Sequence, residues 1–283
     1  MTLFKSCIAV LILSFYSFHM GAQEIQLMTY NIRYSTKSDG ENQWEKRKDF
    51  VRDQLTFYEP DIVGIQEGLH SQVMYLEKNR GHFEFVGVGR DDAKTKGEYS
   101  AIFYNADKFQ LLGHDTFWLS GNPDQISVGW DASMERICTY AFFMEKSSGR
   151  SFWVFNTHFD HRGKKAREKS ADLILEKIKE LNKDDLPVVL LGDFNLNEAS
   201  VPIVKLSTEL NDSRSVSESA PFGPYGTFNG FKYHEPVKDR IDYIFTSKEN
   251  VRVLKYAVIA DFKQLKFPSD HFPVLVRVDL KSD

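Results

Sequence analysis

Cysteine is almost absent from this sequence, which contains only Cys7 and Cys138 in 283 residues. Cys7 falls within an apolar segment at the start of the chain. If that segment is removed, Cys138 is the only cysteine left, so neither an internal disulfide nor a thiolate metal site can form. Cys138 lies in a strand-like run over residues 136–142, and we interpret it as a small core residue rather than a nucleophile.

The sequence also lacks a concentration of basic charge. Its formal net charge is −4, and its lysines and arginines are scattered along the chain. This distribution gives no broad basic face for passive nucleic-acid binding. An enzyme that holds a phosphate through a metal ion does not need such a face, so nucleic acid stays open as a substrate. One small basic cluster is more typical of a solvated helix face than of a phosphate clamp; it comprises Arg162, Lys164, Lys165 and Arg167.

Long hydrophobic runs are missing as well, apart from one near the N-terminus. That run covers residues 7–18, follows Lys5 and precedes small residues. It is too short to span a membrane comfortably, and the pattern resembles a secretory signal peptide. We therefore expect residues 1–22 to be a signal peptide and residues 23–283 to form one domain that is secreted or periplasmic. A buried N-terminal helix is the alternative, and the cleavage position stays open.

What the sequence does contain is a series of apolar strands that end on polar side chains. The clearest covers residues 188–195, VVLLGDFN, where a run typical of a strand buried on both faces stops at Gly, Asp and Asn. Any one such residue is most simply a helix cap or a turn residue, but capping does not account for the whole series. The polar residues at or near these ends are Asn31, Glu67, His158, Asp193, Asn195, Asp242, Asp270 and His271.

The order of the predicted elements indicates the fold. Strand, helix and strand follow one another over residues 24–67 and again over residues 151–195. Further strands are expected at residues 83–88, 99–104, 109–112, 117–120, 136–144, 251–259 and 273–280, with a short helix at 71–78. Many strands with two helix-bearing crossovers predict an α/β (α+β) fold, a four-layer α/β/β/α sandwich of two stacked mixed sheets flanked by helices.

The chemistry of the strand ends favours phosphate esters as substrates. Carboxylate and amide oxygens are sufficient for a hard divalent cation such as Mg²⁺, which keeps several waters. Without a thiolate cluster or a zinc-protease motif, the two histidines favour acid and base roles over a zinc site. Asp242 would orient His271 and raise its basicity. Such a set suits hydrolysis of phosphoesters or phosphodiesters, where charge neutralisation and water positioning supply most of the catalysis.

Six motifs resemble those of the endonuclease/exonuclease/phosphatase superfamily. They are TYNIR at residues 29–33, IQE at 65–67, NTHFD at 156–160, GDFN at 192–195, RIDYIF at 240–245 and SDHFPV at 269–274. Each is weak alone, but their order and approximate spacing match the superfamily over nearly the whole mature chain. The superfamily includes pancreatic deoxyribonuclease, apurinic endonucleases, bacterial sphingomyelinases, inositol-polyphosphate phosphatases and poly(A) deadenylases. The resemblance implies a two-sheet sandwich with one metal-assisted site where the sheet edges meet.

The resemblance also implies roles for individual residues. It makes Glu67 the principal ligand of Mg²⁺, or of Mn²⁺, with Asn31 and Asp270 close to the metal or its waters. Asp193, with Asn195, would orient and deprotonate the attacking water. His271, paired with Asp242, would hold the scissile phosphate. His158 would protonate the leaving oxygen or contact the phosphate.

The substrate is less well defined than the bond type. Arg136 and Asp160 are second candidates for substrate contacts, and for Arg136 a surface ion pair is an equal alternative. We expect a small phosphoester or phosphodiester substrate. The alternatives are a secreted nuclease acting on DNA or RNA, a sphingomyelinase-like lipid phosphodiesterase, and a noncatalytic binding module on the same fold. The oligomeric state stays open.

Overall fold

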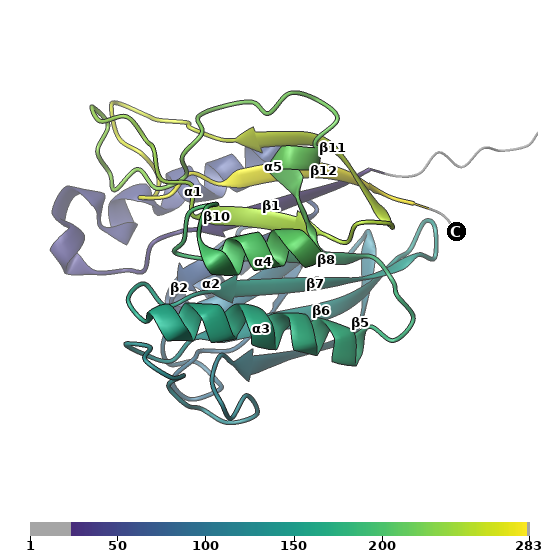
Figure 1. Ribbon diagram of the computed structural model, residues 1–283. Helices are drawn as coiled ribbons and strands as arrows, with labels where there is room; N and C mark the ends of the chain where they lie inside the picture. The colour runs from purple at the N-terminus through teal and green to yellow at the C-terminus, as the bar shows by residue number, and fades with distance from the viewer. Residues whose placement is uncertain (1–23, 282–283) are drawn as a thin grey trace, which may run out of the picture.

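The computed structural model describes residues 24–281 and consists of two stacked six-stranded sheets between layers of helices (Figure 1). The expected signal segment and Cys7 lie outside this range. The first sheet has the strand order β11-β12-β1-β2-β4-β3 and the second β5-β6-β7-β8-β10-β9. Both sheets contain parallel and antiparallel pairs. The four-layer sandwich predicted from the sequence is therefore confirmed.

The strands of the first sheet are β1 (Ile25–Asn31), β2 (Ile62–Gly68), β3 (Phe83–Val86), β4 (Tyr99–Asn105), β11 (Val251–Val258) and β12 (Val274–Leu280). Those of the second are β5 (Phe109–Trp118), β6 (Ile137–Glu145), β7 (Ser151–His158), β8 (Val188–Asp193), β9 (Asn211–Asp212) and β10 (Asp242–Thr246). The helices are α1 (Trp44–Tyr58), α2 (His70–Lys78), α3 (Lys164–Leu181), α4 (Val201–Glu209) and α5 (Ser213–Val216), with a 3₁₀ segment η1 (Lys37–Asn42).

Alternation along the strands produces the layers. In β1, Leu27 belongs to the core between the sheets, whereas Met28 packs in the core beneath α1 and α2. Ile174 of α3 and Ile203 of α4 pack against the outer face of the second sheet, where Figure 1 shows the two helices side by side. Successive side chains of a strand point to opposite faces, so an apolar run supplies apolar residues to both faces of its sheet. No helix within residues 24–281 has the length and apolar character needed to cross a membrane.

Two helical crossovers place the site. β1 and β2 are parallel through α1, and Asn31 pairs with Gln66 at their ends. β7 and β8 are parallel through α3, and His158 pairs with Asp193. Parallel neighbours require such crossovers, and their carboxyl ends lie at the same edge of the sheet. The polar residues that follow these strands are therefore brought to one edge of the sandwich.

The sheets are held at a close fixed spacing by β2 and β7. A Cβ atom added at Gly64 would lie only 1.9 Å from Cδ1 of Leu191, so only glycine fits there. Beside it, Nδ2 of the buried Asn156 donates to the carbonyl oxygens of Ile65 and Ala101 at 3.0 and 2.7 Å. This contact fixes the position of one sheet against the other a few residues from the strand ends.

The elements differ from the sequence-based prediction in two places. Residues 109–112 and 117–120 were expected as separate strands, but β5 continues through Gly113 with a register shift after Leu111. β5 lies at the edge of its sheet, so the polar residues between these segments face outward without interrupting the strand. The short helix α4 was not expected from the sequence. It has only nine residues, and its buried face consists of Pro202, Ile203 and Leu206.

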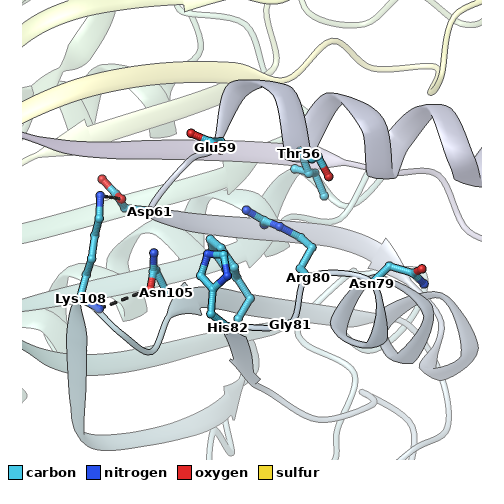
Figure 2. A pocket seen from close by; sticks show the side chains of 11 residues that line it. Thr56, Glu59, Asp61, Asn79, Arg80, Gly81, His82, Asn105 and Lys108 are labelled. Atoms are coloured by element: carbon cyan, nitrogen blue, oxygen red, sulfur yellow. Dashed lines mark hydrogen bonds and ion pairs between the residues drawn. The ribbon is translucent and has the colours of Figure 1, made fainter.

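Two hollows lie at opposite ends of β2. The larger, with a volume of about 640 Å³, contains the carboxyl ends of the strands. The smaller, of about 350 Å³, lies beneath the C-terminus of α1, near Asp61 and Asn105 (Figure 2).

Candidate active site

The polar strand ends meet in the larger hollow, which we call the catalytic cleft. Asn31 and Glu67 come from the first sheet, and Asp193 and Asp242 come from the second. Nδ2 of the buried Asn31 donates to Glu67 Oε1 at 3.1 Å and to Asp193 Oδ2 at 2.9 Å. One amide therefore ties the carboxylates of the two sheets together.

The backbone around the cleft is bent in ways that ordinary residues avoid. Arg33, Glu67 and Asn195 have φ angles of 58°, 62° and 51°, in the left-handed region. Residues other than glycine adopt this region rarely, and such positions often gather at functional sites. Here the conformations turn the chain immediately after β1, within the end of β2 and after β8. They direct Glu67 and Asn195 into the cleft.

Asp193 is held rigidly in a buried position. Its Oδ2 accepts the Asn31 amide, and its Oδ1 accepts the backbone N–H of Asn195 at 2.9 Å. Burial, followed by repulsion from Asp242, raises the pKa of Asp193 to about 7, against the opposing influence of His271. A carboxylate with a pKa near neutrality is well matched to accept a proton from water.

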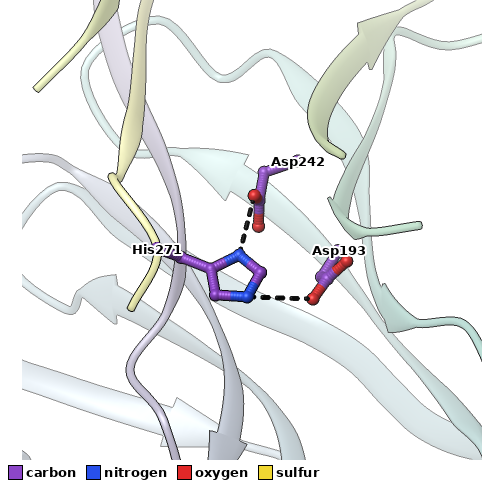
Figure 3. A group of neighbouring side chains, drawn as sticks. All are labelled: Asp193, Asp242 and His271. Carbon is purple, nitrogen blue, oxygen red and sulfur yellow. Dashed lines mark hydrogen bonds and ion pairs between the residues drawn. The ribbon is translucent and has the colours of Figure 1, made fainter. Parts of the chain in front are cut away.

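His271 and Asp242 form a hydrogen-bonded pair (Figure 3). His271 Nδ1 lies 2.9 Å from Asp242 Oδ2, and His271 Nε2 lies 3.7 Å from Asp193 Oδ2. Burial opposes the charged form of His271, but Asp242 and Asp193 outweigh it and raise the histidine pKa well above its ordinary value. The surroundings therefore favour the protonated form of the imidazole, which lines the cleft. The pairing of His271 with Asp242 was predicted from the sequence, and the structure places the two residues as expected.

His158 is held as a neutral ring. Asn195 Nδ2 donates to the carbonyl of Phe159 and also lies 3.0 Å from His158 Nε2. An amide N–H can only donate, so Nε2 is the acceptor and the ring proton lies on Nδ1. Burial, and then the charges of Arg136 and Arg90, lower the pKa of His158 well below its ordinary value. This arrangement suits contact with substrate better than the proton donation considered from the sequence.

Arg136 and Asp160, the two substrate candidates, have separate roles. Arg136 lines the cleft, is 5% exposed, and has no hydrogen-bond partner for Nε or Nη1. Asp160 lies behind it, with Oδ2 3.6 Å from Arg136 Nε. The Asp160 carboxylate already accepts from the backbone N–H groups of Arg162 and Gly163, and from Ser133. Asp160 is thus a positioning residue and does not line the cleft.

Several cleft residues were not singled out from the sequence. Arg90 and Glu98 lie in the loop between β3 and β4. Arg90 Nη1 and Nη2 donate to the two oxygens of Glu98 at 2.8 and 3.0 Å, a pairing across eight residues that no periodic pattern reveals. None of the basic cluster at the start of α3 lines the cleft. The other additional lining residues are Arg33, Tyr34, Met134, His161, Phe228, Asp239 and Ile241.

The fold and this group of side chains agree with a known family. A model of the endonuclease/exonuclease/phosphatase family matches residues 28–271. The match covers most of the chain and includes every strand end that contributes to the cleft. The chain belongs to this family. Members are phosphoric ester hydrolases that depend on a divalent metal, so the protein is a hydrolase of this class.

Two solved structures are similar over almost their whole length. A family member from Bacteroides vulgatus is 39% identical, with a TM-score of 0.87, and the match covers 92% of this chain and 100% of that one. A mannosyl-6-phosphatase from Bacteroides thetaiotaomicron is 37% identical, with a TM-score of 0.86, and the match covers 90% and 99%.

Curated relatives include eukaryotic and viral proteins. Nocturnin of Drosophila melanogaster is 26% identical over 286 residues, which cover 84% of this chain and 42% of nocturnin. A protein of Acanthamoeba polyphaga mimivirus is 29% identical over 163 residues, or 55% of this chain and 60% of that protein. The chain thus spans about half the length of these relatives.

Two groups of side chains in the cleft offer ligands for the family's divalent metal. Glu67 and Asp270 are nearly buried carboxylates that share Arg33, whose nitrogens lie 3.8 Å from an oxygen of each. Asp193, Asp242 and His271 form the other group, with one ligand atom of each within 4.8 Å of the others. Both ring nitrogens of His271 face carboxylate oxygens, which favours a protonated ring over a metal ligand. The oxygen donors Glu67 and Asp270 therefore fit a hard cation better.

Asn31 holds this site rather than presenting an oxygen to it. Its Oδ1 accepts the backbone N–H of Arg33 at 3.0 Å, while its Nδ2 faces Glu67 and Asp193. The sequence placed Asn31 close to the metal or its waters. In this structure the residue lies beside both carboxylates but orients them through N–H donation.

Proposed function

We propose that this protein is a metal-dependent phosphatase that acts on small phosphorylated sugars. The observation that carries the proposal is a polar pocket wall next to the catalytic group, formed by Arg90, Glu98 and Arg136. This wall offers donors and acceptors to a hydroxyl-rich leaving group. The likeness to the mannosyl-6-phosphatase, at 37% identity over 90% of this chain, supports the same substrate class.

The polar wall contains donors that the protein itself does not satisfy. Arg90 Nε, along with Nε and Nη1 of Arg136, is buried without a hydrogen-bond partner. Buried donors without partners are costly, so such groups commonly bind a ligand or ordered water. Glu98 is held by Arg90 and lies 3.9 Å from His158 Nδ1, which connects the wall to the catalytic residues. The hydroxyls of a sugar can accept hydrogen bonds from the two arginines and donate to the Glu98 carboxylate.

The catalytic roles follow from the positions of the side chains. Asp193, fixed by two N–H donors, would accept a proton from the attacking water. Protonated His271, supported by Asp242, would donate to a non-bridging phosphate oxygen and stabilise the negative charge that develops there. His158 would contact the phosphate or the leaving oxygen from the opposite side. The residues thus offer one phosphate a base and a cation, with the neutral imidazole of His158 as a further contact.

The proposed cofactor is Mg²⁺, with Mn²⁺ as a substitute, held by Glu67 and Asp270. When bound, it would neutralise phosphate oxygens and polarise the phosphorus. Asn31 and the backbone N–H of Tyr34, which donates to Glu67 Oε2 at 3.1 Å, fix the orientation of the Glu67 carboxylate. Arg33 would move from its position between the two carboxylates or remain as a phosphate contact.

A nuclease is the second candidate, favoured by the likeness to the 3'-5'-exoribonuclease subunit Ccr4 of Candida albicans, which is 24% identical over 304 residues that cover 84% of this chain. The scattered positive charge of the sequence argues against it, because binding to a nucleic-acid backbone depends on a concentration of lysines and arginines. We also propose that residues 1–22 direct export, which would place the enzyme where small soluble phosphate esters are encountered.

The test is hydrolysis of a defined panel by the purified protein with Mg²⁺ and with chelator. The panel contains mannose 6-phosphate, glucose 6-phosphate, bis-p-nitrophenyl phosphate, sphingomyelin, and DNA and RNA oligonucleotides. We expect chelator-sensitive release of phosphate from a sugar phosphate, lost in Asp193→Ala but retained in Asp124→Ala, which changes an exposed aspartate. Cleavage of oligonucleotides without release of phosphate from the sugars would overturn the proposal in favour of the nuclease.

A further inference from the structure

The smaller hollow is separate from the catalytic cleft. It lies at the start of β2, next to Asp61, whereas Glu67 stands at the other end of the same strand. Six residues of strand separate the two positions by about 20 Å at about 3.3 Å per residue. The two hollows have no lining residue in common. Whatever the smaller hollow binds is therefore independent of the proposed phosphatase function.

Arg80 is the central feature of this hollow. The residue is 7% exposed, and Figure 2 shows its side chain reaching between α1 and the strand ends. Its Nη2 donates to the carbonyl oxygen of Pro60 at a long 3.4 Å, and Nη1 has no hydrogen-bond partner. The ring of Phe83 lies 3.4 Å from the guanidinium carbon. No carboxylate of the described residues forms an ion pair with Arg80, so a buried charge stands without a counterion.

The neighbouring carboxylates are not available to Arg80. Asp61 Oδ1 accepts from Lys108 Nζ at 2.5 Å, and Asp61 Oδ2 accepts the backbone N–H of Gln26 at 2.8 Å. Glu59 is exposed at the rim and raises the pKa of Arg80 less than burial lowers it, to about 10. The cavity therefore contains an arginine that gains no direct charge pairing from the protein.

Asn105 supplies a second donor. It is 9% exposed, and its Oδ1 accepts the backbone N–H groups of Asp107 and Lys108 at 2.9 and 3.3 Å. With the oxygen committed to this turn, the amide nitrogen is the end that faces the cavity (Figure 2). A guanidinium N–H and an amide N–H thus converge on a space of about 350 Å³.

We propose that this hollow is a binding site for a small molecule carrying a carboxylate or a phosphate group, with Arg80 and Asn105 as its anchors. An oxyanion would accept from the Arg80 guanidinium in a charge-assisted hydrogen bond and supply the missing counterion. The volume is sufficient for a molecule of a few heavy atoms beyond the anionic group. The competing explanation is that Arg80 only fastens the Glu59–Pro60 turn through the carbonyl of Pro60, with water on Nη1.

The experiment is a titration of the ¹⁵N-labelled full-length protein with sodium phosphate or with sodium malonate at constant ionic strength, followed by amide chemical shifts. We expect saturable shifts at residues 79–83 and 105–108. Shifts at residues 193–195 and 269–271 report the catalytic cleft and are scored separately. Arg80→Gln should weaken binding at the smaller hollow at least tenfold. Lys78→Gln, which removes an exposed cation from the same segment outside the cavity, should leave it unchanged.

A second variant keeps the test decisive if Arg80→Gln does not fold. Thr56 is exposed on α1 at the rim of the cavity, so Thr56→Glu introduces a competing carboxylate without disturbing the core. It should abolish the shifts at residues 79–83. Binding of phosphate alone, malonate alone or both supports the proposal and identifies the anionic group. Absence of saturable shifts with either anion, or shifts that persist in Thr56→Glu, would show that Arg80 has a structural role only.

Discussion

At the residue scale, the pair of Asp242 and His271 is the part of the proposed mechanism that depends most directly on a single charge. Asp242→Asn preserves the shape of the side chain but removes the negative charge 2.9 Å from His271 Nδ1. Because the protonated imidazole loses its main support, we expect kcat to fall by about 10²- to 10⁴-fold. Activity on the preferred substrate and the circular dichroism spectrum are the two measurements. A variant with an unchanged spectrum and full activity would show that the Asp242 charge has no part in the mechanism; Asp124→Asn is the matched control.

Arg136 allows substrate recognition to be separated from chemistry. We expect Arg136→Gln to raise KM for a sugar phosphate about tenfold or more, because a hydrogen bond to a charged donor contributes about 1.5–3 kcal/mol. For p-nitrophenyl phosphate, which has no hydroxyl-rich leaving group, the change in KM should be much smaller. Arg162→Gln changes an exposed arginine outside the cleft and should alter neither constant. Equal losses on both substrates would assign Arg136 to the phosphate instead.

At the element scale, the turn between β7 and α3 is held by one buried carboxylate. Burial alone would raise the pKa of Asp160, but hydrogen bonds from Gly163, Ser133 and Arg162 outweigh it and hold the pKa well below its ordinary value. A carboxyl with a depressed folded-state pKa contributes stability above its unfolded pKa of about 3.9, and that stability is lost as the pH falls through the folded pKa.

Asp160→Asn should therefore lower the free energy of unfolding by about 1–3 kcal/mol at pH 7. The difference between variant and parent should shrink as the pH is lowered below about 4, because the parent then begins to lose the same contribution. Urea unfolding at a series of pH values measures both quantities, with Asp124→Asn as the exposed control. A difference that stays constant down to pH 3 would mean that the carboxylate charge has no part in holding this turn.

Elements were more predictable than the contacts between them. The alternation in β1 and the helical spacing in α3 follow from local periodicity, and both elements lie within the strand, helix and strand units expected from the sequence. Asp193 and His271 were identifiable because they follow apolar runs within recognisable motifs. The pairing of Arg90 with Glu98 was not, because it depends on the path of an irregular loop. Asp160 was named as a candidate for substrate contact. Its hydrogen bonds to Ser133, Arg162 and Gly163 could not be predicted, because they depend on how the chain folds back after β7.

At the scale of the whole molecule, catalysis depends on the assembly of two sheets that are distant in sequence. Asn31 and Asp193 are 162 residues apart, and their hydrogen bond closes the site between the sheets. Glu67 and Asp270 are still further apart in the sequence. Within residues 24–281, Arg33 is the only cation that forms an ion pair with either carboxylate, so a divalent cation bound there should stabilise the folded protein as a whole.

We expect Mg²⁺ to raise the thermal midpoint of the protein, with a stabilisation of about 2.7 kcal/mol when the free metal is one hundred times its Kd. Glu67→Gln, which removes a ligand charge, should abolish most of this effect, whereas Asp193→Asn should retain it if the metal lies on Glu67 and Asp270. Scanning calorimetry with and without Mg²⁺ at constant ionic strength distinguishes the two groups of ligands. Loss of the metal effect in Asp193→Asn with retention in Glu67→Gln would instead place the ion among Asp193, Asp242 and His271, and His271 would then be a ligand rather than a cation.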